Sequence, residues 1–247
     1  MSSKAGPAEP RRLYAIGDIH GHAELLERLI EKIDRDLSDV PGRDCLTVTV
    51  GDYIDRGPAS RTVLDRLSGN PFPTNYIALR GNHEGMLERF LVEPASVSDW
   101  RLWGGLETLH SYGLDISGLM RGRGHEAAAE ALRAAMPAAH ADFLCNLKLS
   151  LTIGRYFLCH AGVRPGVPLD RQSDEDLLWI RKEFLDSRDD FGKIVVHGHT
   201  PSPEPELRPN RINVDTGVYL TGRLTCAVLD GERVRFLSAT TEGSSGL

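Results

Sequence analysis

The densest group of charged residues in the chain lies at the end of an apolar run. Residues 50–57 read VGDYIDRG and complete the run CLTVTV, so that Asp52, Asp55 and Arg56 fall within five residues. A surface turn uses Gly, Asp or Asn for its backbone conformation, but it does not need this much charge beside a buried strand. The pattern indicates either a solvated loop or a functional site at the end of that strand.

Four other short motifs of the same kind occur in order along the chain: GDIHG, GNHE, HAG and GHT. Each follows an apolar, strand-like run. In open α/β sheets, ligands bind in the crevice at the carboxyl ends of the strands, so these turns are expected to meet there. Their carboxylate, amide and imidazole groups suit divalent first-row metals. The candidate polar residues are Asp18, His20, Asp52, Asp55, Asn82, His83, His160 and His199.

Each motif taken alone has a simpler explanation. Asp-x-His in a turn commonly forms an Asx-turn with a surface histidine. His197 precedes the GHT motif and is expected to pack behind the ligands. Surface or helix-face positions are expected for four further histidines, His22, His110, His125 and His140. The tripeptide Asp215-Thr216-Gly217 also occurs in aspartic proteases, but a tripeptide beside a complete set of metal ligands carries little weight.

Strand-turn-helix patterns in the sequence predict that these turns connect strands to helices. A buried strand in RLYAI leads to a helix from about His22 to Leu37, and CLTVTV leads to a helix after Pro58. The third strand, NYIALR, leads to a helix that contains Met86 and Phe90. Such a repeat predicts an α/β fold with parallel strands. Residues 92–147 read as helical and irregular, and strands return from Leu147 to a hairpin around Asp230-Gly231.

Composition narrows the functional class. The chain has 247 residues and a formal net charge of −6, which argues against a broad nucleic-acid surface. No stretch approaches the roughly 18 apolar residues of a membrane span, and MSSKAGPAEPRR does not resemble a secretory signal. The four cysteines, Cys45, Cys145, Cys159 and Cys226, form no CxxC pair and are expected to be reduced core thiols. A soluble, cytoplasmic protein with no membrane or nucleic-acid partner is therefore expected.

The ordered motifs resemble the phosphoprotein phosphatase (PPP) branch of the calcineurin-like metallophosphoesterases, and in particular bacterial serine/threonine phosphatases similar to phage lambda phosphatase. The resemblance runs from about Leu13 to Gly231 and extends to WGGLETLHSYG, HAGVRPGVPL, DLLWIRKEF and NVDTGVYLTGRLT. It implies a central β-sandwich flanked by helices (αββα). The implied catalytic domain covers residues 13–239 with a helical insertion at about 96–146, between a disordered arm (1–12) and a flexible tail (240–247).

The resemblance also implies a role for each turn residue. Two divalent metal ions would be bridged by Asp52, and the remaining ligands would be Asp18, His20, Asn82, His160 and His199. Manganese is the expected metal, and iron or zinc would also suit these ligands. His83 resembles the family's general acid, and Asp55 resembles the carboxylate that orients it. Arg56 and Arg181 match the phosphate-binding arginines, and Arg80 is a third candidate.

The expected activity is hydrolysis of phosphoserine and phosphothreonine in a phosphorylated protein or peptide. Phosphotyrosine is a further candidate substrate. A symmetrical bis(5′-nucleosyl)-tetraphosphatase is the close alternative, but those relatives tend to lack Asp55 and to carry GNHD. Nucleases and phosphodiesterases of the family often end in GHxH, whereas Pro201 follows GHT here. A noncatalytic binding module would be expected to have lost Asp52, Asn82 or His83, and all three are present. The oligomeric state stays open.

Overall fold

The computed structural model describes residues 12–38 and 44–241 of the chain, and within these ranges two five-stranded sheets lie face to face. The first has the order β10-β9-β1-β2-β3 and the second β4-β5-β6-β8-β7. The strands of the first are β1 (Arg12–Ile16), β2 (Cys45–Thr49), β3 (Asn75–Ala78), β9 (Arg223–Asp230) and β10 (Arg233–Thr240). Those of the second are β4 (Ser150–Ile153), β5 (Tyr156–Cys159), β6 (Ile194–His197), β7 (Glu206–Leu207) and β8 (Arg211–Asn213).

The strands that precede the motif turns are parallel within each sheet. In the first sheet β1, β2 and β3 run in one direction. Strand β9 is antiparallel to β1, and β10 is antiparallel to β9. In the second, β5, β6 and β8 are parallel, whereas β4 and β7 pair antiparallel at the edges. Parallel strands end on the same edge of a sheet, so each sheet brings its motif turns together at one edge.

Alternation along the strands divides the core into layers. In β1, Leu13 and Ala15 join the cluster between the two sheets, whereas Tyr14 and Ile16 pack against the helices outside the first sheet. In β5, Leu158 faces the inter-sheet cluster, and Cys159 lies in the cluster outside the second sheet. Side chains point to opposite faces at every second residue, so each strand serves both layers. Cys159 thus points away from the inter-sheet layer.

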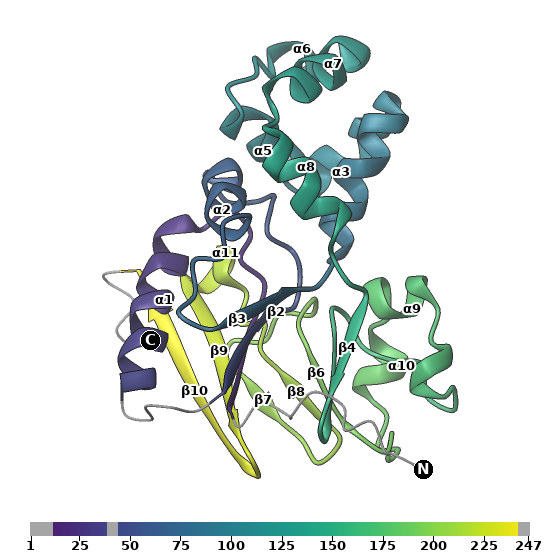
Figure 1. Cartoon of the computed structure of the whole chain (residues 1–247). Helices are drawn as coiled ribbons and strands as arrows, with labels where there is room; N and C mark the ends of the chain where they lie inside the picture. Colours follow the sequence, from purple (N-terminus) through teal and green to yellow (C-terminus); the bar gives the residue numbers. More distant parts are fainter. Residues whose placement is uncertain (1–11, 39–43, 242–247) are drawn as a thin grey trace, which may run out of the picture.

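Helices cover the outer face of each sheet (Figure 1). Helix α1 (Ala23–Ser38) packs on the first sheet, with α2 (Ser60–Leu67) and α11 (Val218–Thr221) nearby. Helices α9 (Asp174–Trp179) and α10 (Lys182–Leu185) cover the second, preceded by the 3₁₀ turn η3 (Leu169–Arg171). The predicted α/β fold, an αββα sandwich, is confirmed.

The segment after β3 forms a helical lobe above the sheets (Figure 1). Its elements are α3 (Asn82–Val92), η1 (Pro94–Ser96), α4 (Val97–Trp100), η2 (Arg101–Trp103), α5 (Gly105–Ser111), α6 (Ser117–Met120), α7 (His125–Ala135) and α8 (Ala138–Cys145). At the ends of the chain, Arg12 already belongs to β1 and Thr240 still belongs to β10. Most of the predicted arm and tail, residues 1–11 and 242–247, lies outside the described residues.

Two sequence predictions about single side chains are wrong. His140 is 1% exposed, because its ring lies between Tyr112 and Asp65, rather than on the surface. Cys145 is exposed at the end of α8, whereas the other three cysteines are buried as predicted. Cys145, Cys159 and Cys226 have free thiols.

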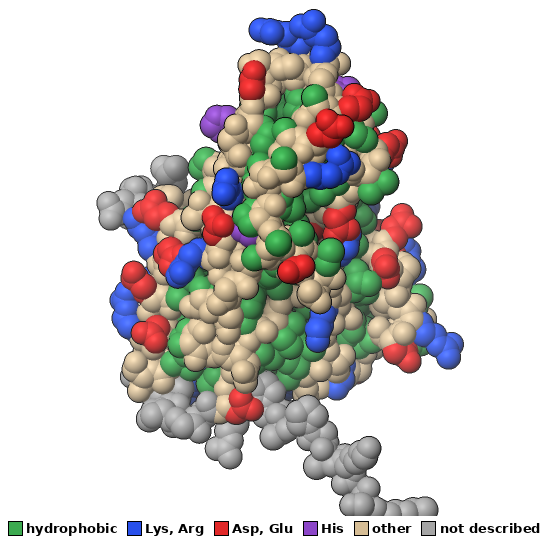
Figure 2. All heavy atoms as spheres, turned by 45° about the horizontal axis from the view of Figure 1, so that its top comes forward, with side chains coloured by type: hydrophobic (Ala, Val, Ile, Leu, Met, Phe, Trp, Pro, Cys, Tyr) green, Lys and Arg blue, Asp and Glu red, His purple; other side chains and the backbone are tan. Residues whose placement is uncertain are grey.

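The described residues contain no helix that is both long and apolar enough to cross a membrane. On the face drawn in Figure 2, basic and acidic side chains are interspersed rather than gathered in one patch. Binding of an anion at this face would therefore depend on individual arginines and their immediate surroundings.

Candidate active site

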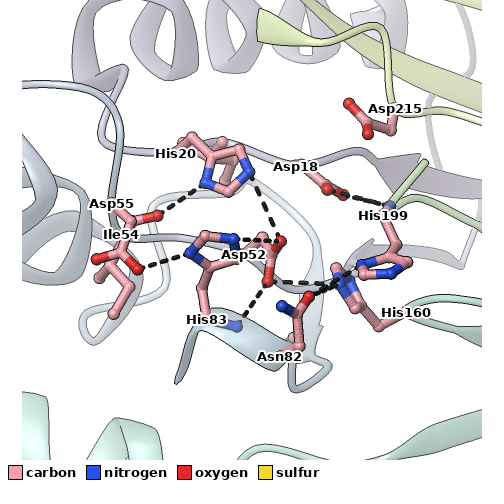
Figure 3. A network of polar contacts seen from close by, with 12 residues as sticks. Asp18, His20, Asp52, Ile54, Asp55, Asn82, His83, His160, His199 and Asp215 are labelled. Atoms are coloured by element: carbon pink, nitrogen blue, oxygen red, sulfur yellow. Dashed lines mark hydrogen bonds and ion pairs between the residues drawn. The ribbon is translucent and has the colours of Figure 1, made fainter. Parts of the chain in front are cut away.

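The motif turns of both sheets converge on Asp52 (Figure 3). Asp18 follows β1, Asp52 follows β2, and Asn82 and His83 follow β3, whereas His160 follows β5 and His199 follows β6. All of these side chains are buried, with exposures of 0 to 5%. The backbone reaches this arrangement through left-handed conformations at His20, Asp52, Asp55, Arg56 and His199. Non-glycine residues avoid this region, and such strain concentrates at functional sites.

Asp52 is surrounded by three histidines. Its Oδ2 lies 3.6 Å from His20 Nε2 and 3.7 Å from His83 Nε2, and its Oδ1 lies 3.4 Å from His160 Nε2. His20 Nδ1 donates to the carbonyl of Ile54 at 2.8 Å, and His160 Nδ1 donates to that of Val50 at 2.9 Å. A histidine whose Nδ1 is held by a carbonyl presents Nε2 in a fixed direction, as metal-ligating histidines do.

Asn82 and His199 extend the group on the side of the second sheet. Asn82 Oδ1 lies 2.9 Å from both His160 Nε2 and His199 Nδ1. His199 Nε2 is buried and has no hydrogen-bond partner in the described part of the chain. A buried polar atom without a partner is costly, and a ligand would satisfy it.

The donor set fits divalent metal ions. His20, Asp52 and His83 offer atoms that all lie within 4.8 Å of one another, and so do Asp52, His160 and His199. Asp18 was predicted in the first group, but that group contains His83 in its place, and the Asp18 carboxylate accepts the backbone N–H of His199 at 3.1 Å. Burial and the charges of Asp215 and Asp52 raise the pKa of Asp18 well above its usual range. Bound cations would offset the negative charge of these buried carboxylates.

Burial and local charge set the protonation of the candidate ligands. Burial lowers the pKa of His20 to about 3 and that of His199 to about 2, so both rings are neutral and can ligate. Burial alone would raise the pKa of Asp52, but the charges of His160 and His83 outweigh it and hold that pKa well below the usual range. His20, His199 and Asp52 are therefore in the protonation states that metal binding requires. Burial would lower the pKa of His160, but Asp52 and Glu84 raise it, so His160, like Asp18, has to lose a proton when a metal binds.

His83 forms a tight pair with Asp55. His83 Nδ1 lies 2.6 Å from Asp55 Oδ2. Trp100 Nε1 donates to the same oxygen at 2.7 Å, and Thr108 Oγ1 donates to Asp55 Oδ1 at 2.5 Å. Burial would lower the pKa of His83, but Asp52 and Asp55 together raise it, which favours the protonated ring. The arrangement suits a general acid.

A cavity of about 280 Å³ opens beside these residues. It is lined by His20, Asp52, Arg56, Asn82, His83, Trp103, Arg181, His199, Pro201, Asp215 and Tyr219. Two of the three predicted phosphate-binding arginines, Arg56 and Arg181, thus reach it. Arg80 does not line it, because its Nη2 pairs with Glu88 Oε2 at 2.5 Å. We therefore leave Arg80 out of the proposed phosphate site.

Sequence reasoning missed several residues that organise the site. Glu84 is fully buried and accepts three backbone N–H groups, those of Asp52, Tyr53 and Gly81, at 2.8 to 3.0 Å. Burial and the charge of Asp52 raise the pKa of Glu84 to about 7. The GNHE motif contained this residue, but nothing in the sequence showed that it supports the turn after β2.

Asp215 is the second missed acid. It was weighed only as part of a protease tripeptide, yet it is 2% exposed and lines the cavity beside Asp18 and His199 (Figure 3). Burial raises its pKa to about 6. In contrast, His197 packs against Phe184 and Arg211 and does not line the cavity. Trp100, Thr108, Trp103 and Tyr219 also carried no sequence signal for the contacts they make.

Comparisons with known proteins agree with this geometry. Serine/threonine-protein phosphatase 1 of Salmonella typhimurium is 30% identical over 88% of this chain and 91% of its own length. Serine/threonine-protein phosphatase 2 of Escherichia coli is 41% identical over 38% of this chain and 39% of its own length. The asymmetrical bis(5′-nucleosyl)-tetraphosphatase PrpE of Anoxybacillus flavithermus is 25% identical over 85% of this chain and 87% of its own length.

Solved structures show the same fold. A cold-active protein tyrosine phosphatase superposes with a TM-score of 0.59 at 17% identity, over 94% of this chain and 79% of the other. Residues 11–226 match the family described as calcineurin-like phosphoesterase. Because that match spans most of the chain and the predicted family motifs converge in the structure, the chain belongs to the calcineurin-like phosphoesterase family.

Proposed function

We propose that this chain is a metal-dependent phosphoprotein phosphatase that hydrolyses phosphoserine and phosphothreonine monoesters. The observation that carries the proposal is the His83–Asp55 pair, 2.6 Å apart and braced by Trp100 and Thr108 at the wall of the cavity. Serine and threonine leave as alkoxides, which are strong bases and need a proton at the moment of bond cleavage. A polyphosphate leaving group is already a stable anion and depends less on a general acid.

Each residue of the site has a separate role in the proposed hydrolysis. Asp52 would lie between two metal ions, with His20 and Asp18 toward one and Asn82, His160 and His199 toward the other. When bound, such a pair of divalent ions supplies hydroxide at neutral pH and neutralises charge on the phosphoryl oxygens. Arg56 and Arg181 bind the phosphoryl oxygens with planar forks of N–H donors. His83 gives its Nε2 proton to the leaving oxygen, while Asp55 holds the Nδ1 proton and the ring orientation.

The donor set supports Mn²⁺, Fe or Zn, and we propose Mn²⁺ for the test. Chelated protein, resupplied with Mn²⁺, is assayed on a phosphoserine peptide, p-nitrophenyl phosphate and diadenosine tetraphosphate. Phosphate release from the peptide should require metal and should fall about 100-fold or more in His83→Asn. His110→Asn, an exposed histidine on α5, is the matched control and should retain activity. Metal content is measured in each variant, because His83 lies near the candidate ligands.

A dinucleoside tetraphosphatase is the second candidate, because the PrpE relatives match over 85% of the chain. The sequence motifs pointed to the symmetrical enzyme as the alternative, whereas these relatives are named asymmetrical. Metal-dependent cleavage of diadenosine tetraphosphate with no release from the peptide would overturn the phosphatase proposal. Bound metal with no activity on any substrate would favour a noncatalytic binding module.

A further inference from the structure

The guanidinium of Arg56 is held by aromatic rings instead of acids. Its Cζ lies 4.0 Å from the ring centroid of Tyr219 and 5.9 Å from that of Trp103. Its Nε is buried without a hydrogen-bond partner, and no carboxylate in residues 12–38 and 44–241 forms an ion pair with it. By contrast, Arg80 pairs with Glu88, and Arg164 pairs with Asp176. Arg56 is thus fixed in place while its donors stay free.

Tyr219 is itself held firmly. It lies on the short helix α11, between two glycines in left-handed conformations, Gly217 (φ 62°) and Gly222 (φ 64°). Its ring packs edge-on against His20, with centroids 5.4 Å apart and an interplanar angle of 88°. The ring therefore contacts a candidate metal ligand and a candidate phosphate-binding arginine at once, and it lines the same cavity.

A cation over an aromatic face is attracted by the ring without using its N–H donors. A carboxylate in the same place would neutralise the guanidinium and compete with an incoming phosphate. We propose that Tyr219 is a positioning residue that holds Arg56 by cation–π contact, so that Arg56 presents unpaired donors to a phosphoryl group; Trp103 supports it from farther away. This rests on the proposed role of Arg56 in phosphate binding, but it does not depend on which phosphoester is the substrate.

The test is a double-mutant cycle on phosphate binding. Inorganic phosphate is titrated into Mn²⁺-loaded protein by calorimetry, for the wild type, Tyr219→Leu, Arg56→Ala and the double variant. Tyr219→Leu should raise the Kd by about tenfold, whereas in the Arg56→Ala background it should add less than about twofold. Tyr219→Phe keeps the ring and should stay within about threefold of the wild type. Leu220→Ala, on the same helix and 71% exposed, is the control and should change nothing.

Kinetics with p-nitrophenyl phosphate separate positioning from folding. If Tyr219 acts through Arg56, Tyr219→Leu raises KM much more than it lowers kcat, and its Tm and metal content stay near those of the wild type. The inference would be overturned if Tyr219→Leu weakened phosphate binding equally in the wild type and in the Arg56→Ala variant. It would also be overturned if Tyr219→Phe weakened binding as much as Tyr219→Leu. A wild-type protein that binds no phosphate would overturn it as well. If phosphate binding changes across the four proteins as expected but the protein does not hydrolyse the phosphopeptide, the proposed function is wrong and the role of Tyr219 still holds.

Discussion

Glu84 shows how one buried acid can fix a catalytic turn. Oε2 accepts the N–H groups of Asp52 and Gly81, and Oε1 accepts that of Tyr53. In Glu84→Gln an amide nitrogen replaces one oxygen, so at least one buried donor loses its acceptor in either orientation. We expect the free energy of unfolding to fall by about 1–3 kcal/mol, and kcat to fall because Asp52 shifts. Urea denaturation measures the first effect and steady-state kinetics the second.

Glu93→Gln is the control for this change. Glu93 lies at the end of the same helix, its side chain is 58% exposed, and it pairs with Arg89. Loss of such a surface pair should cost at most about 1 kcal/mol. If Glu84→Gln were no less stable than Glu93→Gln, the buried contacts of Glu84 would not support the turn.

The limits of sequence reasoning at this scale follow from what each residue contacts. Asp52, Asn82 and His160 could be placed together because each directly follows an apolar strand, and parallel strands end at a common edge. Glu84 and Tyr219 could not be placed, because they act on a backbone turn and a guanidinium from other parts of the chain. Glu84 lies in the GNHE motif and Tyr219 in the matched stretch NVDTGVYLTGRLT, but neither pattern shows which group the side chain contacts.

At the scale of elements, the helical lobe does more than border the cavity. Helices α4 and α5 bring Trp100 and Thr108 to Asp55, the partner of His83. The sequence indicated a helical and irregular segment here. Its hydrogen bonds to Asp55 could not be predicted, since they join residues 45 and 53 positions away from Asp55 across the fold.

Thr108→Val tests this link between lobe and catalysis. Valine has a similar shape but cannot donate to Asp55, so the Asp55–His83 pair should lose its fixed orientation. We expect kcat on a phosphoserine peptide to fall by about tenfold, with a smaller loss on p-nitrophenyl phosphate, whose leaving group needs less protonation. Ser98→Ala, exposed on α4, should affect neither substrate. Equal losses on both substrates would indicate general disruption instead of impaired acid catalysis.

At the scale of the molecule, the site lies where the edges of the two sheets meet. The first sheet supplies Asp18, Asp52 and Asn82, and the second supplies His160 and His199. The repeated strand-turn-helix pattern predicted parallel strands, but it did not divide them between two sheets, which came from the family resemblance. Sheet partition depends on which faces pack together, and near-continuous apolar strands buried on both faces carry little information about that choice.

His140 links the helical lobe to helix α2, which packs on the first sheet, and gives a pH dependence that can be tested. Its Nδ1 lies 2.8 Å from Oη of Tyr112, the residue that follows α5, and its Nε2 lies 2.9 Å from Asp65 Oδ1 on α2. A neutral ring satisfies both, accepting from the tyrosine and donating to the acid. Burial lowers the pKa of His140 below its usual 6.5, although Asp65 opposes this.

A group with a lowered pKa in the folded state resists protonation there, so the unfolded chain takes up the proton first. The stability due to neutral His140 is therefore complete above pH 6.5, falls as the pH drops below it, and levels off once the folded-state pKa is passed. His140→Gln cannot titrate, so between pH 7.5 and 5.5 the wild type should lose more free energy of unfolding than the variant. Urea denaturation at both values measures the difference. Parallel losses in the two proteins would show that the acid sensitivity of the fold arises elsewhere.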